Sequence, residues 1–146
     1  MAEIELNIPA TRRGLCTALA RIEEFAAARN LHADTLGRLR VVVEELVTNT
    51  IKYGYGGECE RPIRLRLNAS HALSLIYEDD APRFDPTAPR PAHDPAARRR
   101  AGREGRAGLD LVLGLSDSAA YDGSAGNRLA LTFLAPDQSA GGPAST

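Results

Sequence analysis

The stretch EELVTNTIKYGYGG, residues 44–57, combines the end of a helical pattern with three closely spaced glycines. The helical pattern starts earlier in the chain and carries one apolar stripe, formed by Leu36, Leu39, Val43, Leu46 and Val47. The pattern predicts a helix that is N-capped by Asp34, runs to about Lys52 and lays the stripe on a sheet. The glycines Gly54, Gly56 and Gly57 then end it.

Three polar residues, Glu45, Asn49 and Lys52, gather on another side of this helix. They supply a carboxylate, an amide oxygen that can ligate a hard cation, and an ammonium group within about one and a half turns. Such a set suits magnesium and phosphate. The same spacing also fits an ordinary solvated face with a polar pair four residues apart, and spacing alone leaves both interpretations open.

The rest of the chain alternates between strand and helix patterns. Residues 2–9 read as an edge strand stopped by Pro9, and residues 11–29 as an amphipathic helix. Residues 62–70 and 72–80 predict an antiparallel hairpin, residues 107–117 a short helix, and residues 118–123 and 127–135 two more strands. This order of elements predicts a two-layer α+β domain, with helices on one face of a mainly antiparallel, mixed sheet.

Residues 81–107 interrupt this order with five prolines, many alanines and a run of arginines. The segment has too few large apolar residues for a core of its own, so it is predicted to be a functional lid. Residues 136–146 are predicted to be a disordered tail. Residues 1–135 therefore form one expected domain, in keeping with a length of 146 residues.

Composition narrows the class of protein. A net charge of -1 and a pI near 6.3 give no basic field, which argues against a nucleic-acid partner. No apolar run reaches membrane-spanning length and no leader pattern is present, so we expect a cytoplasmic protein without a membrane partner. Cys16 and Cys59 lack the spacing of a zinc site or a disulfide framework.

Two further motifs carry possible chemistry. In YEDDAPRFDP, residues 77–86, Asp79 ends a strand and leads into the lid, where it can accept a hydrogen bond from an exocyclic amine such as that of adenine. A plain strand-ending turn is the alternative. In GREGRAGLDLV, residues 102–112, glycines precede the predicted helix and would let backbone amides approach an anion.

The order of these three motifs resembles the GHKL nucleotide-binding superfamily of gyrase, the heat-shock chaperone, histidine kinases and MutL. Residues 45–53 are similar to its N box, residues 79–81 to its first G box, and residues 105–112 to its second. The length, DDAPRFDP and the closing NRLALTF look most like the anti-sigma-factor serine kinases of bacterial partner-switching modules. The resemblance covers residues 3–135 and implies the Bergerat, or histidine-kinase-like ATPase, fold.

The resemblance also implies roles for individual residues. Asn49 would ligate the Mg²⁺ of bound ATP, Glu45 would activate the attacking group, and Asp79 would read adenine. The other residues expected to bind nucleotide are Lys52, Ala81, Gly105, Gly108 and Leu109. Three positions depart from the family pattern: Ala81 replaces a glycine, Arg106 and Ala107 replace a glycine and an aliphatic residue, and Asn127 with Arg128 stands where some relatives carry a Thr.

The function that the resemblance implies is a protein serine/threonine kinase. It would phosphorylate a STAS-type anti-sigma antagonist and, in another state, bind a sigma factor to regulate transcription. Ala81 and the unusual second G box leave open a nucleotide-binding module that sequesters a partner without phosphotransfer, and a slow ATPase is a third possibility. The helix at residues 11–29 fits either a homodimer or partner surface, or plain core packing.

Overall fold

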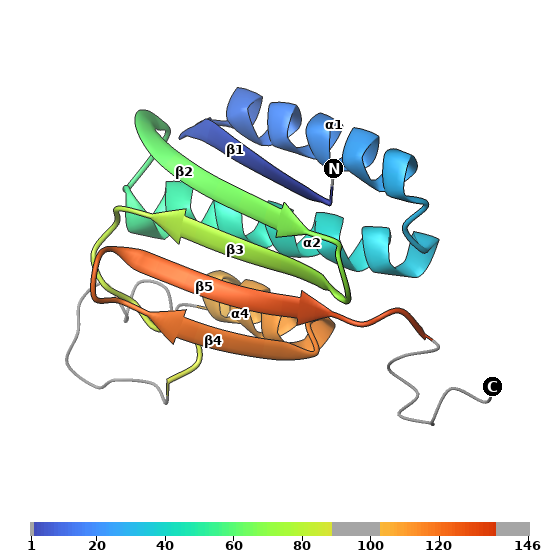
Figure 1. Ribbon diagram of the computed structural model, residues 1–146. Coiled ribbons are helices and arrows are strands. Elements are labelled where there is room, and N and C mark those ends of the chain that lie inside the picture. The colour runs from blue at the N-terminus through green and yellow to red at the C-terminus, as the bar shows by residue number, and fades with distance from the viewer. Residues whose placement is uncertain (1, 89–102, 137–146) are drawn as a thin grey trace.

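The protein is described here by a computed structural model of residues 2–88 and 103–136. A five-stranded sheet, in the order β1-β2-β3-β5-β4, carries three helices on one face (Figure 1). The elements are β1 (Glu3–Ala10), α1 (Arg12–Arg29), α2 (Ala33–Asn49), the π-helical turn η1 (Thr50–Gly54), β2 (Cys59–Asn68), β3 (Leu73–Asp79), α4 (Arg103–Leu115), β4 (Ser118–Asp122) and β5 (Asn127–Phe133). The predicted two-layer α+β fold is confirmed, with all four strand pairings antiparallel rather than mixed.

The core lies between the sheet and the helices. Strand residues at alternate positions point into it, such as Leu65, Leu75 and Leu131, while their neighbours face the open side of the sheet. Four residues of the predicted α2 stripe, Leu39, Val43, Leu46 and Val47, are buried against them, and Leu36 packs at the margin. The inward face of the strands and the apolar stripe of α2 therefore pack together in one apolar layer.

The N-terminal edge differs slightly from the prediction. β1 is an edge strand, as expected, but it continues through Pro9 to Ala10 with a shift of register there. A proline is tolerated at this position because an edge strand has fewer ladder hydrogen bonds to lose. Thr11 then caps α1 by accepting a hydrogen bond from Gly14, whose missing side chain lets the helix sit against the Pro9 carbonyl.

The ends of α2 also differ from the prediction. His32, not Asp34, is the N-cap, because its Nδ1 accepts a hydrogen bond from the Asp34 amide. The regular helix stops at Asn49, and η1 continues it as a wider turn that ends before Gly56 and Gly57. Both of these glycines have positive φ, which residues with a side chain rarely adopt.

The second half of the chain contains the largest correction. α4 begins at Arg103 and not at residue 107, so Gly105 lies inside the helix instead of preceding it, and the last residues of the predicted lid are helical. Residues 89–102 of that lid and residues 137–146 of the predicted tail lie outside the described residues. Within the described ranges, no helix is both long and apolar enough to span a bilayer.

Candidate functional site

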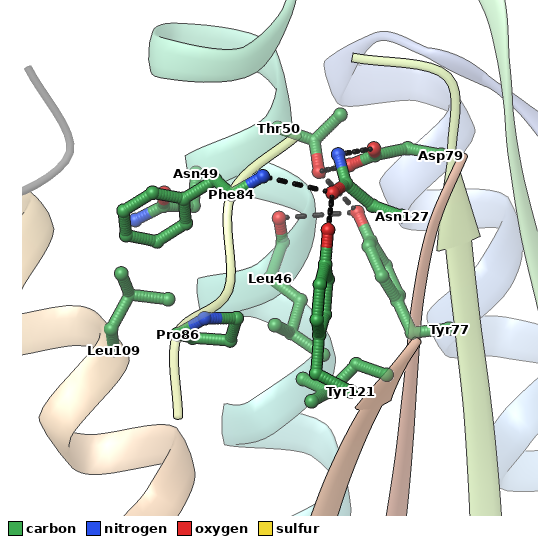
Figure 2. A pocket seen from close by; sticks show the side chains of 11 residues that line it. Leu46, Asn49, Thr50, Tyr77, Asp79, Phe84, Pro86, Leu109, Tyr121 and Asn127 are labelled. Carbon is green, nitrogen blue, oxygen red and sulfur yellow. Dashed lines mark hydrogen bonds between the residues drawn. The ribbon is translucent and has the colours of Figure 1, made fainter. Parts of the chain in front are cut away.

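Asp79, the last residue of β3, lies at the base of a small pocket under α2 and α4 (Figure 2). Asp79 as a whole residue is only 2% exposed, and a buried carboxylate is tolerated only when hydrogen bonds replace its contacts with water. Oδ2 accepts from the Thr50 hydroxyl at 2.7 Å, and Oδ1 accepts from the Ala81 amide at 3.2 Å and from the Asn127 side chain at 2.9 Å. Three donors from three segments therefore hold this carboxylate.

Thr50 and Tyr77 extend the network into the core. The Thr50 and Tyr77 hydroxyls lie 2.7 Å apart, and the Tyr77 hydroxyl is also within 3.1 Å of the Leu46 carbonyl (Figure 2). Because the carboxylate can only accept, Thr50 gives its one hydrogen to Asp79, and the one hydroxyl hydrogen of Tyr77 is shared between the Leu46 carbonyl and the Thr50 oxygen. The first residue of η1 is thus fixed to β3.

Asn127, the first residue of β5, is paired in register with Asp79 and makes the second set of hydrogen bonds in the site. Its Nδ2 lies 2.9 Å from Asp79 Oδ1 and 3.1 Å from the carbonyls of Ala81 and Pro82. Its Oδ1 accepts from the Phe84 amide at 3.0 Å and from the Tyr121 hydroxyl. The backbone donor at Phe84 fixes which end of the amide is oxygen.

Glu45 and Asn49 are one helical turn apart on α2, as predicted, but they have different surroundings. Asn49 is buried and lines the Asp79 pocket. The Glu45 carboxylate is partly exposed and reaches α4, where a Cβ built on Gly108 would lie 2.5 Å from its Oε2. Gly108 therefore gives the Glu45 carboxylate its space.

Lys52 is not brought to this pocket. It is exposed and lines a groove between α1 and α2, together with Arg12, Glu44 and Glu58. The regular 3.6-residue period would have placed it near Asn49, but the π-helical turn η1 contains more residues per turn and rotates it away.

Ala81 and Leu109 are both buried at the site. Leu109 lines the pocket and packs with Phe84, while Ala81 joins the network through its backbone amide and carbonyl. Alanine in place of the family glycine causes no backbone strain at position 81, because Asn30 is the only non-glycine residue with positive φ in the described part of the chain. Gly105 lies in the first turns of α4.

Asp80 points away from Asp79, on the outer side of the site. Hydrogen bonds from Arg64, at 3.0 and 3.4 Å, hold the pKa of this carboxyl below its usual value. On the inner side, burial raises the pKa of the Tyr121 phenol, which keeps it a hydrogen-bond donor to Asn127. The two neighbouring carboxylates thus have separate partners.

The polar groups fit the exocyclic amine of adenine, but the space does not fit the base. The cavity beside Asp79 measures about 30 Å³, room for one or two waters, whereas small-molecule pockets begin near ~300 Å³. For Mg²⁺, Asn49 offers a hard amide oxygen, and the described residues contain no cluster of acidic, His or Cys side chains that could hold a metal. Phosphates and water would have to supply its other ligands.

Sequence reasoning missed Thr50, Tyr77, Tyr121 and the full role of Asn127. A signal was present for Asn127, because it begins the period-2 series that continues with the inward residues Leu129, Leu131 and Phe133. A polar residue at an inward position needs a partner in the core. Tyr77 stands two residues before Asp79 and therefore faces the same side of β3.

Comparisons with known proteins agree with this fold. The chain belongs to the histidine kinase-like ATPase domain family, which matches residues 8–133. It is similar in fold to the crystal structure of the RsbU and RsbW domains of Rv1364c from Mycobacterium tuberculosis, with a TM-score of 0.62 and 16% identity. The match covers 92% of this chain and 32% of that one, so the chain spans about a third of its length. A search of curated proteins finds no match.

Proposed function

We propose that this chain is an ATP-dependent protein serine/threonine kinase of the anti-sigma type. Its substrate would be a STAS-type anti-sigma antagonist. In its other state it would bind a sigma factor in the cytoplasm. The kinase itself would be a homodimer. The observation that carries the proposal is the Asp79 network beside Asn49, with Glu45 one turn away against Gly108. Family membership supports ATP binding, and the substrate is our inference.

Asp79, Asn49 and Glu45 would have different roles in phosphotransfer. Asp79 would bind the adenine amine, and Asn49 would provide one ligand to Mg²⁺. When bound, Mg-ATP supplies the phosphoryl group that a protein hydroxyl attacks. Glu45 accepts the proton that this hydroxyl loses, and its place at the margin of α2 and α4 leaves it accessible to a second protein.

The test is Glu45→Gln, which keeps the shape of the side chain but removes the base. Phosphotransfer from Mg-ATP to a STAS-type antagonist should fall by at least about 100-fold, because a general base contributes roughly 10²–10⁴. Glu44→Gln is the matched control, since the neighbouring Glu44 is exposed in the groove between α1 and α2. Undiminished transfer by Glu45→Gln would disprove the assigned mechanism.

A second candidate is a partner-sequestering module that binds nucleotide without transferring phosphate. Two departures from the family pattern favour it: Ala81 in place of a glycine, and Arg106 with Ala107 in the second G box. This candidate predicts no phosphorylated Ser or Thr on the antagonist when wild-type protein and Mg-ATP are present. Any such phosphoprotein, detected by mass spectrometry and absent without ATP, would eliminate it.

A further inference from the structure

The position that an adenine amine would take on Asp79 is already occupied by a chemically equivalent group. The Asn127 amide donates to Asp79 Oδ1 at 2.9 Å, and an amide NH₂ is the same kind of donor as the exocyclic amine of adenine. Oδ2 is engaged by Thr50. Oδ1 also accepts from the Ala81 amide, so both of its lone pairs are used, and a base that reads Asp79 through Oδ1 would compete with Asn127.

The same amide also fastens the segment that follows β3. Its Nδ2 contacts the carbonyls of Ala81 and Pro82, and its Oδ1 accepts the Phe84 amide hydrogen. Tyr121 donates to that oxygen from β4 (Figure 2). Asn127 thus ties the end of β3, the next five residues and β4 into one unit.

The fastened segment brings its side chains over the pocket. Phe84 and Pro86 are buried and line it, and Phe84 packs against Leu109 of α4 (Figure 2). These side chains leave only about 30 Å³ beside Asp79. To reach Asp79, a purine would have to displace the Phe84 side chain. The hydrogen bond from the Phe84 backbone amide to Asn127 holds the backbone of this segment in its present position.

We propose that Asn127 is a positioning residue that keeps the nucleotide pocket filled by Phe84 and competes with adenine for Asp79. This inference rests on the proposed nucleotide site. It predicts that an adenine nucleotide does two things at once: it replaces the Asn127 amide on Asp79 and releases the Phe84 amide from its buried hydrogen bond.

The experiment compares wild type, Asn127→Ser and Tyr121→Phe by calorimetric titration with Mg-ADP. Serine is too short to hold Asp79 and Phe84 together, so Asn127→Ser should bind at least about tenfold more tightly than wild type. Tyr121→Phe removes one donor to Asn127 but keeps the ring, so it should give a smaller gain in the same direction. If Asn127→Ser folds poorly, Tyr121→Phe still allows the inference to be tested.

Hydrogen exchange at the Phe84 amide supplies a readout that a purely structural role would not move. Mg-ADP should accelerate exchange of this amide in the wild-type protein, although ligands usually slow the exchange of residues around their site. Slower exchange of Phe84 with Mg-ADP would overturn the inference, since Phe84 would then stay in place over the bound base.

The titration separates the inference from the proposed function. If wild type binds Mg-ADP and both folded variants bind equally or more weakly, the inference fails and the nucleotide site stands. If no folded form binds Mg-ADP, the nucleotide function fails and the inference falls with it. If only the variants bind Mg-ADP, or if they bind it more tightly than wild type, both the nucleotide function and the role of Asn127 are supported.

Discussion

At the scale of single residues, the site depends on how two adjacent carboxylates are partnered. Asp79 faces inward and receives hydrogen bonds from Thr50, Ala81 and Asn127, whereas Asp80 faces outward and pairs with Arg64. Successive strand residues point to opposite faces, so the end of β3 directs these neighbours to different surroundings. Only the buried one can recognise a ligand in the pocket.

The Asp80–Arg64 pair predicts a pH effect. Because the hydrogen bond from Arg64 lowers the pKa of Asp80 below its usual value, the pair stabilises the fold at higher pH, and this contribution is lost as pH falls through the folded-state pKa. Arg64→Gln should raise the Asp80 pKa toward its usual value, as measured by NMR titration of the carboxyl carbon. Arg66→Gln is the control, because Arg66 pairs with Glu5, and it should leave the Asp80 pKa unchanged.

At the scale of elements, the contact between α2 and α4 sets the position of Glu45. A Cβ on Gly108 would lie 2.5 Å from Glu45 Oε2, too close for both to stay in place. The clash is with the flexible end of a side chain, so the carboxylate can move at little cost in stability. Gly108 therefore matters more for where Glu45 points than for whether α4 forms.

This contact predicts that Gly108→Ala separates stability from activity. Alanine is favoured over glycine in a helix by up to ~1 kcal/mol, so the free energy of unfolding should stay level or rise. Phosphotransfer should fall by about 100-fold, because the base is displaced. Gly114→Ala is the control, because Gly114 lies in the same helix and its added carbon would have no atom within 4 Å apart from the nearby helix backbone. It should have the same free energy of unfolding as Gly108→Ala but full phosphotransfer activity. Full phosphotransfer by Gly108→Ala would contradict the assigned place of Glu45.

At the scale of the whole molecule, nucleotide binding would join parts of the chain that are far apart in sequence. The pocket is lined from α2, η1, β3, the segment after β3, α4, β4 and β5. A ligand held by so many elements stabilises the folded state as a whole.

Thermal melting with Mg-ATP tests this coupling. A ligand at about 100 times its Kd adds roughly 2.7 kcal/mol of stability, so wild-type Tm should rise. Asn49→Ala and Asp79→Asn should show no rise, because the first removes the proposed Mg²⁺ ligand and the second replaces one oxygen of the proposed adenine acceptor with an NH₂ donor. No shift for the wild type would favour a partner-binding module that acts without nucleotide. Equal shifts for all three proteins would contradict the residue assignments.

The sequence by itself determined the elements and their inward faces. The alternation of β2, β3 and β5 and the stripe of α2 are local patterns, and local periodicity specifies which side of an element is buried. Glu45, Asn49 and Asp79 were found for the same reason, since each stands at a fixed place in such a pattern. Their proposed roles came from the family resemblance.

Only the tertiary structure decided what surrounds those residues. The π-helical turn moves Lys52 to another groove, and the packing of α4 on α2 places Gly108 against Glu45. The pairing of Asn127 with Asp79 joins residues 48 positions apart. These features depend on contacts between distant segments, which no local periodicity encodes, so the filled pocket became visible only in the folded chain.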